Sequence, residues 1–162
     1  MKVVRWMTAV AGIASILSVQ APYRAFGATG DPEIILYRFP GVTDNGGAAI
    51  TGVATSFICT NFSGVAENFR IVVRDGNGGV VANRLVSNIP HLVTVTFSTH
   101  DTNLLLDSNL LTGAVAQGTA AIAVTSTSVV CTAMIIDAAS SSSPQGIALH
   151  GIRFNPVPGT QE

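Results

Sequence analysis

The sequence predicts an all-β domain, an antiparallel β-sandwich of two sheets, and three observations support this. Short runs rich in Val, Ile, Thr and Phe alternate with clusters of Gly, Pro, Asn and Asp, which is typical of strands joined by tight turns. Several runs alternate apolar and polar residues with a period of two, as half-buried strands do. Residues 28–162 contain no lysine and three glutamates, so runs of good helix formers are almost absent.

The strands are expected between recognisable turns, and we count roughly seven to nine of them. The Asp-Gly-Asn-Gly-Gly string at 75–79 supplies the positive φ angles that hairpin turns need. The apolar stretch 120–139 is interpreted as two strands because Thr and Ser at 125–128 interrupt it and its centre is β-branched. We expect 107–109 to be a turn. The expected strands are 33–39, 50–61, 69–74, 80–85, 92–98, 118–124, 129–137 and 147–154, with 104–106 as a short edge piece.

The N-terminus has the three parts of a secretory signal peptide. Lys2 and Arg5 are positive, an uncharged apolar run follows to Val19, and a more polar stretch ends in the small-residue exit Ala25-Phe26-Gly27. The apolar run is too short for a transmembrane helix, which needs about 20 residues. We therefore predict a cleaved signal at 1–27, one domain at 28–162, no stable membrane insertion, and a secreted protein, either periplasmic or extracellular.

The charge pattern limits the partners. Residues 28–162 carry five arginines and nine carboxylates, a net charge of −4, and charged residues are 10 % of the chain. Because nucleic acid needs a basic stripe for its phosphates, we expect no nucleic-acid partner, and an anionic membrane is disfavoured for the same reason. The surface is expected to be neutral and rich in hydroxyl groups, which suits hydrogen bonding to glycans or to other subunits.

The two cysteines are predicted to form a disulfide, since exported chains meet an oxidising compartment. Cys59 and Cys131 each lie in the string Thr-Ser-x-x-Cys-Thr, in predicted buried strands 72 residues apart. We expect the bridge to join strands of opposite sheets and to stabilise the fold by roughly 4 kcal/mol. A redox pair or metal thiolates usually need Cys-x-x-Cys spacing, which the chain lacks.

This cysteine spacing resembles that of immunoglobulin-like sandwiches, in which a bridge joins two central strands of opposite sheets. The hallmark Trp between the cysteines is missing, and Val129 stands where a Tyr is expected, so the resemblance is to the fold and not to true immunoglobulin domains. The strings at 59–63, 72–78 and 149–156 resemble an uncharacterised group of small secreted bacterial proteins. That resemblance covers most of the domain and implies no known activity.

Chemical motifs are sparse. His91 and His100 flank one predicted strand, about 25 Å apart at ~3.3 Å per residue, so they and His150 are expected at the surface or rim rather than around a shared metal. The chain has no Gly-x-Ser-x-Gly elbow. The glycine-rich strings at 44–47 and 75–79 lack the closing carboxylate of a calcium loop. We therefore predict no cofactor, no metal and no enzymatic activity.

One strand carries a candidate interaction surface. In 129–137 the outward face is almost as apolar as the inward one, although one face of a sandwich strand normally meets water. Such a face is expected to be covered by another part of the chain or by a second subunit in a homo-oligomer. Its residues are Val130, Thr132, Met134 and Ile136.

The favoured function is therefore a non-enzymatic structural or interaction module at the cell surface or outside the cell, with an unknown protein or glycan as partner. The alternative is a module that binds a glycan or small ligand, with loops around 101–109 as its site. Tyr37, Phe62, Phe69 and Phe154 are the aromatic residues whose exposure would favour this alternative. A metal-dependent enzyme ranks far behind both.

Overall fold

The computed structural model describes residues 34–142 and 146–154, which form ten strands and no helix. In these ranges no helix is long and apolar enough to cross a membrane. The predicted signal peptide and the first residues of the predicted domain lie outside the described residues. The strands are β1 (Ile34–Asp44), β2 (Val53–Asn61), β3 (Glu67–Arg74), β4 (Val80–Ile89), β5 (Thr94–Ser98), β6 (Asp107–Asn109), β7 (Val115–Val124), β8 (Val129–Asp137), β9 (Gly146–Leu149) and β10 (Ile152–Arg153).

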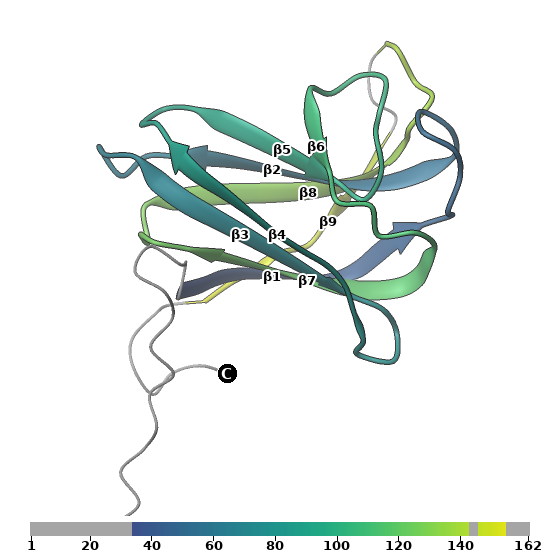
Figure 1. Ribbon diagram of the computed structural model, residues 1–162, viewed down its shortest axis with the longest axis horizontal. Helices are drawn as coiled ribbons and strands as arrows, with labels where there is room; N and C mark the ends of the chain where they lie inside the picture. The colour runs from purple at the N-terminus through teal and green to yellow at the C-terminus, as the bar shows by residue number, and fades with distance from the viewer. Residues whose placement is uncertain (1–33, 143–145, 155–162) are drawn as a thin grey trace, which may run out of the picture.

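The strands form two five-stranded sheets that face each other as the layers of a sandwich (Figure 1). Sheet A has the order β10-β1-β7-β3-β4 and is antiparallel throughout. Sheet B has the order β6-β5-β2-β8-β9, and its β5–β6 pair is parallel. The all-β prediction is confirmed. The strand count of seven to nine is too low, and a purely antiparallel fold is wrong at β6.

One apolar core fills the space between the sheets. Four phenylalanines on four strands are almost completely buried there, and two of them meet edge to face at a centroid distance of 5.7 Å. Burying a side chain of this size contributes about 2–3 kcal/mol, so these rings account for much of the contact between the layers. They are Phe39, Phe57, Phe69 and Phe97.

Several predicted strand boundaries differ from the structure, and at two places the reason is that strand pairing overrides local turn signals. The first strand continues through Pro40 and Gly41 to Asp44, with register shifts against β7 that accommodate both residues. The predicted turn at 107–109 is strand β6, while the predicted edge piece at 104–106 is irregular. A three-residue strand depends on its neighbour, here β5, and local sequence does not reveal that neighbour.

The last predicted strand is two strands in different sheets. β9 pairs with β8 in sheet B, and β10 pairs with β1 in sheet A. Between them, Gly151 lies against Phe39, and a Cβ atom built on Gly151 would lie 2.2 Å from the Phe39 ring. The chain therefore closes this side of the sandwich at a position where only a glycine fits without displacing the core.

The disulfide joins Cys59 and Cys131, as predicted, but within one sheet. These residues lie directly opposite each other on the neighbouring strands β2 and β8, with Cα atoms 4.1 Å apart. The prediction that the bridge joins the two sheets is therefore wrong. The repeated Thr-Ser-x-x-Cys-Thr string places both cysteines on the core face, but that face is shared by adjacent strands of one sheet as well as by opposite sheets.

The hairpin at 75–79 is confirmed between β3 and β4. Asp75 closes it, because its carboxylate accepts the N–H groups of Asn77 and Gly79 at 2.9 and 2.8 Å. The carboxylate that could have belonged to a calcium loop thus serves the turn of its own chain.

Candidate functional site

The outer face of sheet A carries a furrow along its central strand, β7. Apart from the core residue Ile122, this strand carries only small residues from Gly118 to Ala123, and only short side chains such as Thr119 and Ala121 rise from its outer face. The flanking strands β1 and β3 carry longer side chains at the paired positions. A row of small residues between two rows of long ones produces a depression, so the furrow follows directly from the sequence and the strand order.

Two arginines stand on opposite sides of the furrow. Arg38 on β1 pairs with Ala121, and Arg74 on β3 pairs with Thr119. The two arginines are therefore two strand spacings apart, with β7 between them, and their partners on β7 are two residues apart, so they face each other diagonally across β7. Both are exposed. At ~4.8 Å between strands and ~3.3 Å per residue, their Cα atoms are about 12 Å apart, within the combined reach of two arginine side chains.

The C-terminal part of the described chain forms the remaining wall. Phe154 is fixed by a hydrogen bond from its N–H to the carbonyl oxygen of Leu36 at 2.9 Å, and the guanidinium carbon of Arg38 lies 5.6 Å from its ring centroid. The furrow encloses about 250 Å³. Its lining residues are Arg38, Phe39, Pro40, Val72, Arg74, Thr119, Ala120, Ala121, Ile152 and Phe154.

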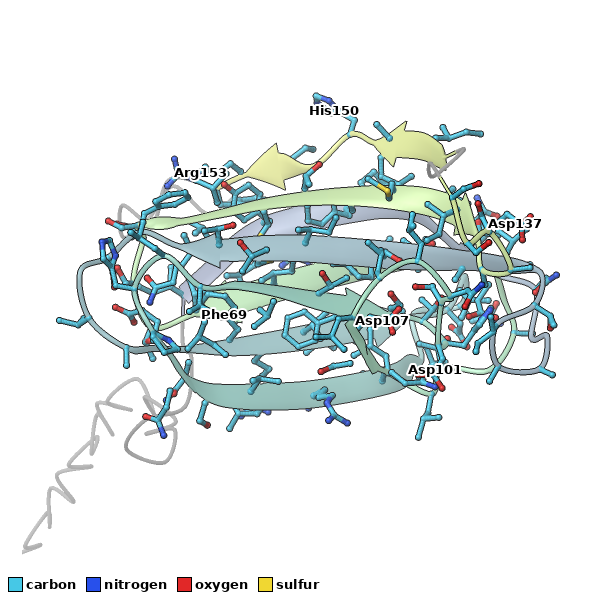
Figure 2. All side chains as sticks on the ribbon, turned by 90° about the horizontal axis from the view of Figure 1, so that it is seen from above. Phe69, Asp101, Asp107, Asp137, His150 and Arg153 are labelled. Atoms are coloured by element: carbon cyan, nitrogen blue, oxygen red, sulfur yellow. A yellow bond between two sulfur atoms is a disulfide. The ribbon has the colours of Figure 1, made fainter. Side chains whose placement is uncertain are left out.

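Charge is distributed unevenly over the described residues. Arg38, Arg70 and Arg74 share the outer face of sheet A, and none of the described residues that the register places on that face is acidic. The acidic residues lie instead at turns and strand ends, and Figure 2 shows Asp101, Asp107 and Asp137 towards one end of the molecule. The furrow is thus a locally positive surface on a chain that is negative overall.

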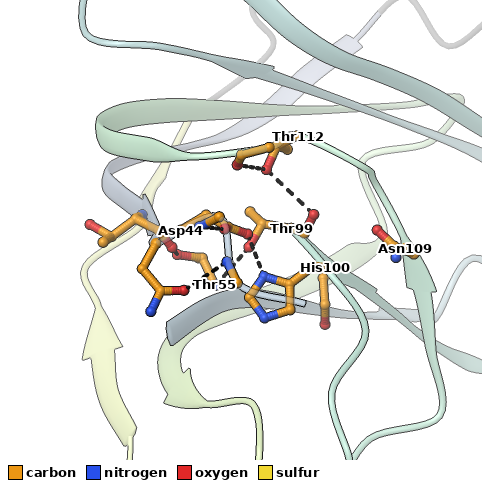
Figure 3. A network of polar contacts seen from close by, with 12 residues as sticks. Asp44, Thr55, Thr99, His100, Asn109 and Thr112 are labelled. Atoms are coloured by element: carbon orange, nitrogen blue, oxygen red, sulfur yellow. Dashed lines mark hydrogen bonds and ion pairs between the residues drawn. The ribbon is translucent and has the colours of Figure 1, made fainter. Parts of the chain in front are cut away.

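A second group of polar residues lies at the end of the sandwich where β1 ends (Figure 3). His100 is buried, and its Nδ1 atom lies 2.7 Å from a carboxylate oxygen of Asp44. Its Nε2 atom lies 3.1 Å from the carbonyl oxygen of Thr51. Both partners are acceptors when Asp44 is ionised, so the two hydrogen bonds are made together only when each ring nitrogen carries a proton.

The surroundings of this pair are also hydrogen-bonded. The second carboxylate oxygen of Asp44 accepts the N–H of Gly46, and hydroxyl groups join the neighbouring backbone segments, as Thr99 does with the N–H of Thr55 at 3.0 Å. No buried side-chain polar atom in the described residues lacks a partner. We interpret this network as structural, because its groups are directed at one another and not at a cavity.

The other predicted site residues are dispersed. His91 is exposed and accepts the N–H of Gly64 through Nδ1 at 3.0 Å, and His150 is also exposed. His100, which was expected at the surface or rim, lies at the end of the sandwich but is buried there. Within the part of the chain that the structure describes, no three His, Cys, Asp or Glu side chains are placed to hold a metal ion.

The loop at 101–109, where the sequence suggested a ligand site, is fixed by its own contacts. Thr102 donates from both its N–H and its hydroxyl group to Asp107, and Asn103 donates its N–H to the carbonyl oxygen of Ala138. Of the aromatic residues proposed for inspection, Tyr37 and Phe69 are buried, Phe62 is half exposed, and Phe154 lines the furrow.

The predicted interaction surface on β8 is divided. Val130 is 52 % exposed and Thr132 is also exposed, whereas Met134 is half-buried and Ile136 is 2 % exposed. At the Ile136 end the outer face of sheet B is covered, since Ser56 and Ser98 there are completely buried and bonded to each other. Only the Val130 end of this face is open to solvent.

Comparisons with known proteins do not place the chain in a family: no family model matches it, and neither does any curated protein or solved structure. The furrow is therefore the feature of the described residues from which a function can be inferred. Sequence reasoning missed the furrow because it needs the strand order. The available signal was the run of mostly small residues at 118–123 together with Arg70 and Arg74, which are four positions apart and therefore share one face of a strand.

Proposed function

We propose that this protein is an exported, non-enzymatic interaction module that binds a ligand in the furrow between Arg38 and Arg74. The observation that carries the proposal is the furrow itself, an apolar floor between two guanidinium groups. Ligand sites are typically concave and mostly apolar, with a few polar groups that fix orientation. The alternative of a ligand-binding module is thereby favoured over a purely structural role, with its site on the sheet and not in the loops.

The wall residues are held in place without a ligand. Phe154 is anchored through its backbone, and Arg74 donates from Nη1 to the carbonyl oxygen of Gly78 at 2.8 Å. A site whose side chains are already ordered loses less conformational entropy when it binds. The floor is part of a central strand that is paired on both sides, so the site rests on a rigid element.

Export is the second part of the proposal. It rests on the signal sequence at 1–27 and is supported by the Cys59–Cys131 bridge, because disulfides persist in oxidising compartments. We also propose that the domain begins at residue 28. For the immunoglobulin-like assignment, the two-layer form is the remaining support, since the bridge lies within one sheet.

The test is an NMR titration of oxidised residues 28–162 with a panel of neutral sugars, acidic sugars and small carboxylates. The proposal expects at least one ligand to shift the amide signals of Thr119 and Ala121. Ala121→Phe, which fills the furrow, should abolish the response. Ala139→Phe, an exposed position outside the furrow, is the matched control. Shifts that avoid β7, or a response that survives Ala121→Phe, would refute the proposal.

A second candidate function is self-association through the open end of sheet B. Val130 is a half-exposed β-branched residue beside exposed Thr132. A homo-oligomer formed there would make the chain a structural subunit. This candidate leaves the furrow free, because the two surfaces lie on outer faces of different sheets.

A further inference from the structure

We infer that the furrow binds a carboxylated polysaccharide, a sugar chain that contains uronic acid units, and that Arg38 and Arg74 hold its carboxylates. This inference rests on the proposed function and specifies the ligand class for the same site. Its three supports are the charge of the face, the geometry of the arginines, and the position of the furrow within the sheet.

The charge of the face favours an anion. Arg38 and Arg74 share the outer face of sheet A, where the register places no acidic residue among those described. A guanidinium group presents N–H donors in a planar fork that matches a carboxylate. Arg38 and Arg74 approach the furrow from opposite walls, so carboxylates on successive units of one chain can each meet an arginine.

The arginines are partly oriented before a ligand arrives. Arg38 lies over the ring of Phe154, and Arg74 donates one N–H group to the carbonyl oxygen of Gly78. A guanidinium has five N–H donors, so this single bond leaves Arg74 with donors for a ligand. Contact with an aromatic ring engages the face of a guanidinium group and does not use the N–H groups along its edge.

The position of the furrow favours a sugar over a peptide. Extended peptides are usually recognised at a sheet edge, where unpaired backbone groups add a strand. The furrow lies over β7, whose backbone is paired with β1 and β3, so a peptide backbone finds no such partners. A sugar ring instead offers C–H surface to Pro40, Ile152 and Phe154 and hydroxyl groups to Thr119, all of which line the furrow.

The size and the overall charge exclude larger polyanions. A volume of about 250 Å³ lies just below the range of ~300–1,000 Å³ typical of small-ligand pockets, which suits one or two sugar units. Duplex nucleic acid would extend far beyond this face, towards ends of the sandwich that carry carboxylates, and those would repel its phosphates.

The experiment compares two forms of one ligand. Calorimetric titration at about 50 mM salt uses oligogalacturonate and the same oligomer with its carboxylates methyl-esterified. Oligogalacturonate should bind, and the ester should bind at least ~10-fold more weakly, since it lacks the charge-assisted hydrogen bonds. Arg38→Gln and Arg74→Gln should each weaken binding of the acid by ~10-fold or more.

The matched control is Arg84→Gln. Arg84 is an exposed arginine on β4, and its register partner Ile71 faces the core, so its side chain leaves the sheet on the side opposite the furrow. This variant removes the same charge and should change the affinity less than ~2-fold. All three arginines are exposed, so each variant is expected to fold. Thermal melting of each variant checks this.

Four results would each overturn a different part of the inference. Equal binding of the acid and the ester would overturn the carboxylate assignment, while the furrow remains a site if Thr119 and Ala121 respond. Equal loss in Arg84→Gln and Arg38→Gln would overturn it in favour of unspecific attraction. Polyglutamate binding as tightly as oligogalacturonate would overturn the choice of a sugar. Absence of heat with both sugar forms would overturn the ligand class, and the wider panel would still test the proposed function.

Discussion

Loss of the Cys59–Cys131 bridge should destabilise the domain by about 4 kcal/mol. The bridge closes a loop of 72 residues, and the chain-entropy model gives about 4.4 kcal/mol for that length at 25 °C. The value depends on the loop and not on which sheets are joined, so the position of the bridge within sheet B leaves it unchanged. It is a large fraction of the ~5–15 kcal/mol that stabilises a typical domain.

The assay is urea unfolding of oxidised and reduced protein, followed by fluorescence or circular dichroism. With a slope of about 1–2 kcal/mol per molar urea, the midpoint should fall by about 2–4 M on reduction. The double variant Cys59→Ala/Cys131→Ala should lose somewhat more, because both sulfurs are buried and their packing is lost as well. A change below about 1 kcal/mol on reduction would refute the loop-closure reasoning.

Three further predictions follow from single contacts. His100→Ala should cost about 3–5 kcal/mol in urea unfolding, since it removes the side-chain partner of one oxygen of the buried Asp44 carboxylate. His91→Ala, at an exposed contact, should cost under about 1 kcal/mol, and equal costs of the two variants would contradict the assignment of the His100 network as structural. Gly151→Ala should lower stability by about 1–3 kcal/mol, because its Cβ would displace the buried ring of Phe39; an unchanged melting temperature would show that the ring has room. Val130→Lys should turn any homo-oligomer into monomers in sedimentation experiments, and an unchanged mass would exclude this face.

Local sequence predicted the strands where one strong signal decides. The range 129–137 is strand β8 with both ends as expected, because its β-branched centre is flanked by Ser and Thr on one side and Ala on the other. The Asp75 hairpin was predictable from its own residues. By contrast, β6 exists only through pairing with β5, and the break at Gly151 exists because a ring from a distant strand lies there.

The candidate site could not be predicted from local sequence either, because it depends on which strands lie side by side. Arg38, Ala121 and Arg74 are separated by 36 or more positions in sequence and meet only because β7 lies between β1 and β3. The pairing of Cys59 with Cys131 was predictable because the chain has only two cysteines. The sheet to which each of their strands belongs was not predictable. Alternation assigns a residue to a face of its own strand and cannot identify the strand beside it.

The net charge of the chain does not describe the charge of each of its faces. The chain is negative beyond residue 27, yet its described carboxylates serve mainly to close turns and brace strand ends. Five of them accept hydrogen bonds from their own chain: Asp44, Glu67, Asp75, Asp107 and Asp137. Carboxylates engaged in this way lie away from the outer face of sheet A, on which the register places Arg38 and Arg74. The field that a ligand meets is therefore set by the face it approaches, and for the furrow that field is positive.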